Sequence, residues 1–237
     1  MSGKNEFHYV GGELELFAEA RNWKAYWRSQ IEPLLCGDVL EVGAGLGANT
    51  QLLRSGRQAN WLCLEPDRAL LDHLRVCFET QPPAAACEIM HGTVADLDQG
   101  RQFDAILYID VLEHIEDDRA ELERAAGHLK PGGHLIVLSP AHQWLFSKFD
   151  EQIGHFRRYT RRSLLAIAPP GLRVRRAVYL DSCGLSLSLG NRLFLRQSLP
   201  HRRQIRFWDR VVVPVSRVLD PLLARSFGKT VLAVWVR

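Results

Sequence analysis

Two groups of residues in this chain have the types and spacing to do chemistry. The first is a turn in which Glu41 precedes three alternating glycines, Gly43, Gly45 and Gly47. Glycines tolerate a left-handed backbone and let amide N–H groups approach a ligand closely. A helix that follows such a turn directs the positive end of its dipole at an anionic group. The turn therefore indicates a site for a nucleotide-like ligand.

The second group combines histidines with charged and aromatic side chains. His114 follows an apolar segment, and His155 opens a run that contains Arg157, Arg158 and Tyr159. An imidazole with an ordinary pKa of about 6.5 accepts a proton at neutral pH, and arginines hold anionic groups in a fixed geometry. Either histidine could be a general base, or could only order its loop. The arginines could clamp an acceptor, or could form a structural turn on the acidic half of the chain.

These residues need a scaffold that alternates strands and helices. Apolar segments predict strands near 38–42, 60–65, 88–91, 103–108 and 134–139, and helices near 49–55, 67–78 and 119–129. This alternation favours right-handed βαβ units and a mostly parallel, doubly wound α/β sheet. Ligands of such sheets bind outside the carboxyl ends of the strands, where the candidate residues lie.

Further elements are expected on both sides of this core. The pattern predicts an N-terminal helix at 13–35, a functional loop at 141–159, a helix at 161–167, and strands at 172–179 and 230–236. A helical insertion is expected at 184–228, where Pro214 and Pro221 should interrupt an apolar helical pattern. We interpret this insertion as a packed lid over an apolar acceptor. An interfacial helix on a membrane and simple packing on the sheet or a second subunit are the alternatives.

Length and composition fit one domain. The 237 residues, 46% hydrophobic and 24% charged, are typical of a soluble globular protein. We expect a single domain over 1–237, with a core at 36–140 and a substrate-side loop at 141–170. No apolar run is long enough to span a membrane, and no signal segment follows Met1, so a cytoplasmic location is expected. The five cysteines lack CxxC spacing, which predicts free thiols and no metal site.

The charge is unevenly distributed along the chain. Residues 1–150 carry 13 basic and 23 acidic side chains, whereas residues 151–237 carry 17 basic and 4 acidic ones. A basic third on an acidic body suggests a partner with phosphate or carboxylate groups. The same arginines could instead pair with the acidic half of the protein.

The glycine turn, read as E-x-G-x-G-x-G, resembles the first motif of class I S-adenosylmethionine (SAM) methyltransferases. Segments 64–67, 91–97, 103–115 and 129–135 resemble further motifs of that family, in the same order. The likeness is closest to small-molecule methyltransferases of the ubiquinone-biosynthesis O-methyltransferase type. The G-H-x-R-R-Y segment at 154–159 is similar to a subset of bacterial methyltransferases. The resemblance implies a Rossmann-like, seven-stranded sheet.

The resemblance also implies how the cofactor is held. The glycine loop would wrap the amino-acid end of SAM, Glu41 would hold its ammonium, Glu65 would accept hydrogen bonds from the ribose, and segment 91–97 would contact adenine. The implied cofactor-binding residues are Glu41, Gly43, Ala44, Gly45, Gly47, Asn49, Glu65, Pro66, Thr93, Val94, Asp110 and Val111.

We therefore expect an enzyme that moves a methyl group from SAM to O or N of a small or lipid-linked molecule and leaves S-adenosyl-L-homocysteine. His114 and His155 are the candidate catalytic residues, and Arg157, Arg158 and Tyr159 the candidate acceptor-binding residues. A non-catalytic SAM-binding scaffold and an RNA methyltransferase are the alternatives. Residues 110–113 stand where amino-methylating nucleic-acid enzymes place N-P-P-Y, so a nucleic-acid partner is not expected. Peripheral membrane contact, and a monomer or a homodimer, remain open.

Overall fold

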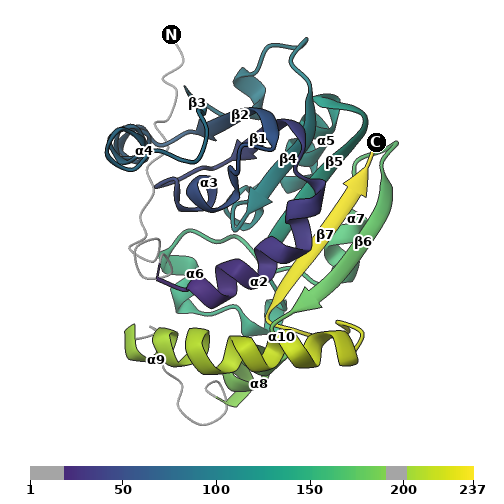
Figure 1. Cartoon of the computed structure of the whole chain (residues 1–237). Helices are drawn as coiled ribbons and strands as arrows, with labels where there is room; N and C mark the ends of the chain where they lie inside the picture. Colours follow the sequence, from purple (N-terminus) through teal and green to yellow (C-terminus); the bar gives the residue numbers. More distant parts are fainter. Residues whose placement is uncertain (1–18, 191–201) are drawn as a thin grey trace.

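A computed structural model describes residues 19–190 and 202–237. A seven-stranded sheet in the order β3-β2-β1-β4-β5-β7-β6 forms its centre (Figure 1). Strands β1 to β5 run parallel, and β7 is antiparallel to both of its neighbours. The predicted doubly wound, Rossmann-like sheet is confirmed. The strands are β1 (Gly37–Val42), β2 (Gln58–Glu65), β3 (Glu88–His91), β4 (Phe103–Ile109), β5 (Leu129–Pro140), β6 (Arg173–Leu180) and β7 (Thr230–Val236).

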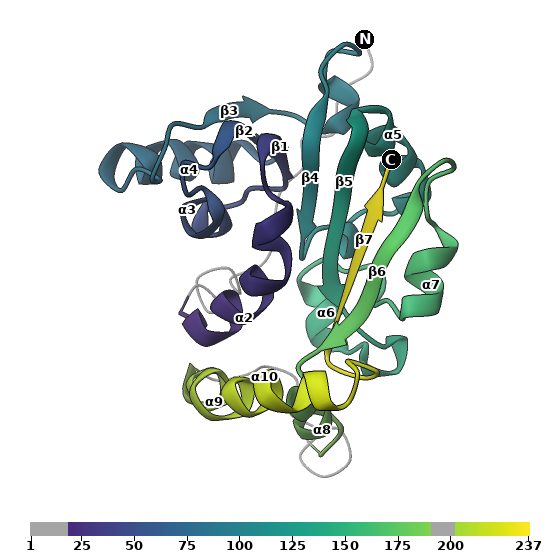
Figure 2. The ribbon, with the colours of Figure 1, turned by 45° about the vertical axis from the view of Figure 1, so that its right-hand side comes forward.

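Helices cover both faces of the sheet, which explains why its central strands are apolar on both sides. Side chains of α2, α3 and α4 pack on one face, and side chains of α5 and α7 pack on the other (Figure 2). Successive side chains of β7 point to opposite faces of the sheet. Val231 and Trp235 belong to one core, and Leu232 and Val234 belong to the other. The helices are α2 (Arg21–Ile31), α3 (Ala48–Leu53), α4 (Arg68–Thr80), α5 (Asp118–Gly127), α6 (Lys148–Gln152), α7 (Arg161–Ala166), α8 (Ser182–Gly190), α9 (Arg202–Phe207) and α10 (Val213–Leu222).

The predicted strands agree with the structure to within two residues, except for β5. This strand begins at Leu129 instead of residue 134, because residues 130–133 form an irregularity within the strand. A Cβ on Gly133 would lie 3.0 Å from the carbonyl oxygen of Phe103, so the two backbones approach too closely there for a side chain.

The insertion before β7 forms a long helical segment, and the predicted interruptions at its prolines are wrong. Helix α9 continues through a π-helical stretch, η6 (Trp208–Val212), into α10. Pro214 lies in the first turn of α10, directly after the π-helical stretch, and Pro221 lies in the last turn. Because the helix continues through Pro214, this proline removes one intrahelical hydrogen bond, and the π-helical stretch directly before it makes room for the ring. The helical segment therefore has one inner and one outer face that both run along its whole length.

Buried carboxylates of the insertion hold the N-terminal helix. Ala20 provides no side-chain cap for α2. Instead, the Asp209 carboxylate accepts hydrogen bonds from the backbone N–H groups of Trp23, at 2.9 Å, and Asn22, at 3.3 Å. Asp220 accepts a hydrogen bond from the Tyr26 hydroxyl at 2.7 Å. Residues 13–18 of the predicted helix lie outside the described residues, and α2 begins at Arg21.

Replacement of Asp209 should destabilise the fold because it leaves the first N–H groups of α2 without acceptors. We expect Asp209→Ala to lower the free energy of unfolding by about 2 kcal/mol, measured by urea denaturation. Asp72→Ala is the control, because Asp72 is exposed on α4 and its ion pair within residues 19–190 and 202–237 is with Arg75 at 3.4 Å. Its cost should stay below about 0.5 kcal/mol. Equal stabilities of the two variants would contradict the capping role of Asp209.

Candidate functional site

The register of the sheet brings the predicted site residues to one edge. Val42 of β1 pairs with Leu64 of β2 on one side and with Tyr108 of β4 on the other. Glu65 pairs with His91 of β3. Four parallel strands therefore end at nearly the same level, and the loops that follow them lie next to one another. The inserted helices α8, α9 and α10 lie at this carboxyl edge as well (Figure 2).

The glycine turn can be built only from glycine at its key positions. Gly43, Gly45 and Gly47 have φ values of 68°, 54° and 79°, in the left-handed region. A Cβ on Gly43 would lie 2.7 Å from Val111, and one on Gly47 would lie 2.5 Å from Leu74. The turn thus packs directly against the loop after β4 and against α4, and the amides of Gly43, Gly45 and Gly47 donate to acceptors within the protein.

Glu65 joins this turn to the end of β2. Its Oε2 accepts a hydrogen bond from the Gly45 amide at 2.8 Å, and its Oε1 accepts one from the Asp67 amide at 2.9 Å. Burial raises the pKa of Glu65, and the two backbone N–H groups oppose that shift. A carboxylate has about four lone-pair directions. Glu65 can therefore accept two further hydrogen bonds from a ligand.

Glu41 is buried beneath the same turn. Its Oε2 accepts hydrogen bonds from the Thr50 hydroxyl at 2.6 Å and the Trp61 indole at 3.0 Å. Its Oε1 is buried and finds no hydrogen-bond donor among the residues that the structure describes. Burial raises the pKa of Glu41 to about 7, against the effect of the two hydrogen bonds. An unpartnered buried carboxylate oxygen is costly, and a cationic ligand would relieve that cost.

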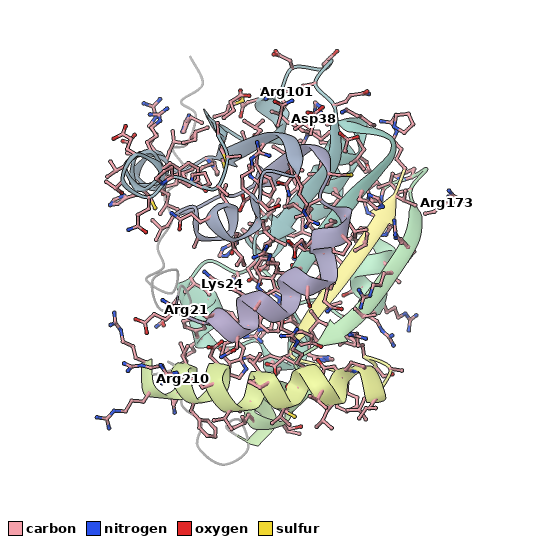
Figure 3. The ribbon with its side chains drawn as sticks, viewed as in Figure 1. Arg21, Lys24, Asp38, Arg101, Arg173 and Arg210 are labelled. Atoms are coloured by element: carbon pink, nitrogen blue, oxygen red, sulfur yellow. The ribbon has the colours of Figure 1, made fainter. Side chains whose placement is uncertain are left out.

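Asp110 and Lys24 influence each other electrostatically at this edge. Asp110 follows β4 with a φ of 54°, which is strained for a residue other than glycine. Its side chain is exposed. Burial lowers the pKa of Lys24, and the nearby charge of Asp110 opposes the shift. Lys24 lies on α2, in front of the sheet (Figure 3). Sequence reasoning missed it, since a lysine between Trp23 and Tyr26 reads as the polar side of a core helix.

The adenine segment and the first residues of α3 have simpler surroundings. Thr93 and Asp96 form a capping box around the short 3₁₀ helix η2 (Val94–Asp96), in which Val94 is buried. Asn49 lies in the first turn of α3, and the carbonyl of Pro66 contacts a ring nitrogen of His91 at 3.0 Å. These residues lie at the same sheet edge as the glycine turn.

His155 is held by a buried acid in the loop after β5. Its Nδ1 lies 3.0 Å from Asp150, a fully buried residue at the third position of α6. Arg158 donates two hydrogen bonds to the same carboxylate, at 2.7 and 3.0 Å. Burial opposes ionisation of Asp150, but the bonds from His155 and Arg158 outweigh it and hold its pKa well below the usual range. Because ionised Asp150 can only accept, Nδ1 of His155 is the donor, and Nε2 of the neutral ring is an acceptor.

Glu113 and His114 lie beside His155, on the 3₁₀ turn η3 (Leu112–His114). Glu113 is fully buried and accepts a hydrogen bond from Ser139 at 2.9 Å; burial and the charge of Asp110 raise its pKa well above the usual range. The rings of His114 and His155 meet edge to face at 4.5 Å. Burial, and then His155, lower the pKa of His114 to about 4, below the ordinary value assumed from the sequence.

These three side chains offer one possible metal-ligand atom each, within 4.8 Å of one another. The expectation that the chain has no metal site stays a prediction. Asp150 and Glu113 were missed as site residues. Both could have been identified from their position, because Asp150 lies in the same segment as His155 and Glu113 lies next to His114.

The three predicted acceptor-binding residues make contacts within the protein. Arg157 pairs with Asp118 at 2.7 Å and donates to the carbonyl of Glu116. The hydroxyl of Tyr159, which is buried, donates to Asp118 at 2.7 Å. Arg158 is engaged by Asp150. These contacts correspond to the alternative interpretation of this run as a structural turn.

Comparison with known proteins agrees with this geometry. Residues 40–135 match the family model described as a methyltransferase domain. A ubiquinone biosynthesis O-methyltransferase of Alkalilimnicola ehrlichii is 33% identical over 102 residues, which cover 41% of this chain and 39% of that protein. The enzyme of the same name from Bradyrhizobium diazoefficiens is 28% identical over 107 residues, which cover 45% and 41%. The chain thus aligns with about two fifths of these relatives' length.

Solved structures share the fold over most of the chain. An S-adenosylmethionine-dependent methyltransferase from Clostridium acetobutylicum has a TM-score of 0.58 at 13% identity and covers 92% of each chain. The N-methyltransferase NodS from Bradyrhizobium japonicum, in complex with S-adenosyl-L-homocysteine, has a TM-score of 0.57 at 15% identity and covers 93% of this chain and 87% of its own. At these identities the likeness establishes the fold.

Proposed function

We propose that this chain, which belongs to the class I SAM-dependent methyltransferases, transfers the methyl group of SAM to an oxygen or nitrogen of a small or lipid-linked molecule. The observation that carries the proposal is the 2.8 Å hydrogen bond from the Gly45 amide to Glu65. It joins a glycine turn to an acidic strand end at the edge where α/β sheets bind ligands. The ubiquinone-type relatives support the small-molecule class of acceptor.

The residues at the edge fit the chemical groups of SAM. The unpartnered Oε1 of Glu41 suits the ammonium, and the remaining acceptor positions of Glu65 suit the ribose hydroxyls. The absence of side chains at Gly43, Gly45 and Gly47 suits a close approach of the amino-acid end to the turn. When bound, SAM supplies a methyl group already activated by its sulfonium. The protein then has to position the acceptor and, for a hydroxyl, remove a proton.

His155 is the better candidate for the base. Asp150 fixes its tautomer and would stabilise the imidazolium that forms when Nε2 takes a proton, as a buried carboxylate does in other base–acid pairs. The pKa of about 4 keeps His114 neutral but makes it a weak base at neutral pH. We therefore assign proton transfer to His155 and contact with the acceptor to His114. A nitrogen acceptor that is already neutral would need neither histidine as a base.

A substitution in the turn tests cofactor binding. Gly45→Asp places a side chain and a negative charge where φ is 54° and where Glu65 lies 2.8 Å from the amide. We expect at least about a thirtyfold loss of SAM affinity in isothermal titration, since strain and charge repulsion each exceed about 1 kcal/mol and 1.4 kcal/mol is tenfold. Gly100→Asp is the control, because a Cβ there meets open space and should leave affinity unchanged. Equal affinities of the two variants would remove the assignment of the turn.

The pH dependence of SAM binding tests Glu41. An ammonium partner favours the carboxylate, so below a pKa of about 7 Glu41 must lose a proton on binding. The affinity of the wild type should therefore fall as the pH drops from 7 to 5.5, with a slope of at most about tenfold per pH unit. Glu41→Gln should flatten this slope. Parallel titration curves for the wild type and the variant would show that Glu41 does not hold the ammonium.

Replacement of His155 tests the base. If the acceptor is a hydroxyl, His155→Gln should lower the rate of methyl transfer about a hundredfold and leave SAM affinity unchanged. His73→Gln is the control, since His73 is exposed on α4 and should have no effect. Wild-type turnover of His155→Gln with a hydroxyl acceptor would exclude the proposed role.

A further inference from the structure

The helical segment 202–222 presents two apolar faces, of which one packs against other described elements and the other is exposed. The inner face is buried and packs on α2 and β6. The outer face, here called the apolar stripe, consists of five exposed residues spaced four, four, three and four apart, which places them on one side of a helix. They are Phe207, Val211, Val215, Val218 and Leu222, with 47% to 76% of each residue exposed.

More exposed apolar side chains extend this stripe. Leu223 and Phe227 follow it in the chain, and Leu187 and Leu189 are exposed on α8, which packs against α10. Single exposed apolar residues are ordinary, but a patch built along one helix and its neighbour marks an interaction surface.

A row of arginines runs beside the stripe. Arg203, Arg206, Arg210 and Arg217 are exposed, at spacings of three, four and seven residues. Arg210 is marked on this helix in Figure 3. The acidic residues of segment 202–222 are Asp209 and Asp220, and both are buried and engaged with α2. The exposed charged groups of this segment are therefore all cationic.

We infer that this outer face docks on an anionic membrane surface. An amphipathic helix that lies in the interface buries its apolar side chains among the acyl chains and directs its basic ones to lipid phosphates. No helix in the described part of the chain is long and apolar enough to cross a membrane. A two-fold contact with a second copy would bring the arginine rows of both chains together without an acidic partner on this face. The charge thus favours lipid over a second copy.

The position of the helix connects this surface to the site. Asp209 and Asp220 bind α2, and α2 carries Lys24 beside Asp110. The docking face and the carboxyl edge of the sheet are therefore joined through a single helix. An acceptor with an apolar tail could reach the site while its tail stays in the lipid. This last step rests on the proposed function, whereas the docking itself does not.

Vesicle co-sedimentation tests the inference. The wild type should bind phosphatidylcholine vesicles that contain phosphatidylglycerol, bind pure phosphatidylcholine weakly, and lose binding as salt rises. Val218→Asp should lower the partition coefficient at least tenfold, because it replaces a buried apolar contact with a charge. Val76→Asp is the matched control, since Val76 is a helical valine on α4 with 58% exposure against 66% for Val218. It should bind like the wild type.

A second pair of variants isolates the arginines. Arg210→Gln combined with Arg217→Gln should lower binding to the anionic vesicles about thirtyfold, since each basic residue contributes about 1 kcal/mol and 1.4 kcal/mol is tenfold. Arg162→Gln combined with Arg173→Gln changes the net charge equally, at exposed positions outside this helix, and should have a much smaller effect.

Three results would overturn the inference. They are a wild type that leaves anionic vesicles unbound, a Val218→Asp variant that binds as well as Val76→Asp, and a dimer in solution that Val218→Asp dissociates in the absence of vesicle binding. SAM titration of the same samples separates this failure from a failure of the proposed function. Intact SAM affinity with no vesicle binding removes the membrane surface alone.

Discussion

The site depends on the parallel register of β1, β2 and β4, which end level with one another. This register places the glycine turn within 2.8 Å of the Glu65 carboxylate and sets Val111 where any side chain on Gly43 would collide with it. A shift of one residue would turn Glu65 to the other face of the sheet. Burial of both faces makes such a shift costly, so the apolar core keeps the polar edge in place.

Two buried carboxylates connect the helical insertion to the N-terminal helix α2. Asp209 and Asp220 lie in the insertion, and each accepts a hydrogen bond from α2, almost two hundred residues away in sequence. A buried charge without partners is expensive, so the N-terminal helix and the insertion stabilise each other. The consequence is that the helix over the cofactor edge and the exposed amphipathic helix form one unit.

The sequence predicts the core well, because strand periodicity and glycine spacing are local signals. It fails where contacts are long-range. The prolines at 214 and 221 were expected to break the helix, but a π-helical stretch and a terminal position accommodate them. Asp150 stands in the same segment as His155 and Arg158, but its role depends on the two side chains meeting it in space. Burial likewise lowers the pKa of Lys24 and of His114. The spacing of residues in the sequence does not reveal which side chains are buried.

The central claim is methyl transfer from SAM to a small or lipid-linked acceptor. It is tested most directly by incubating the protein with methyl-labelled SAM and a cell extract separated into lipid, metabolite and RNA fractions. The account predicts label in the lipid or metabolite fraction, and none when Gly45→Asp replaces the wild type. Label confined to RNA would contradict the class of acceptor, and no label in any fraction despite tight SAM binding would show a scaffold that does not catalyse transfer.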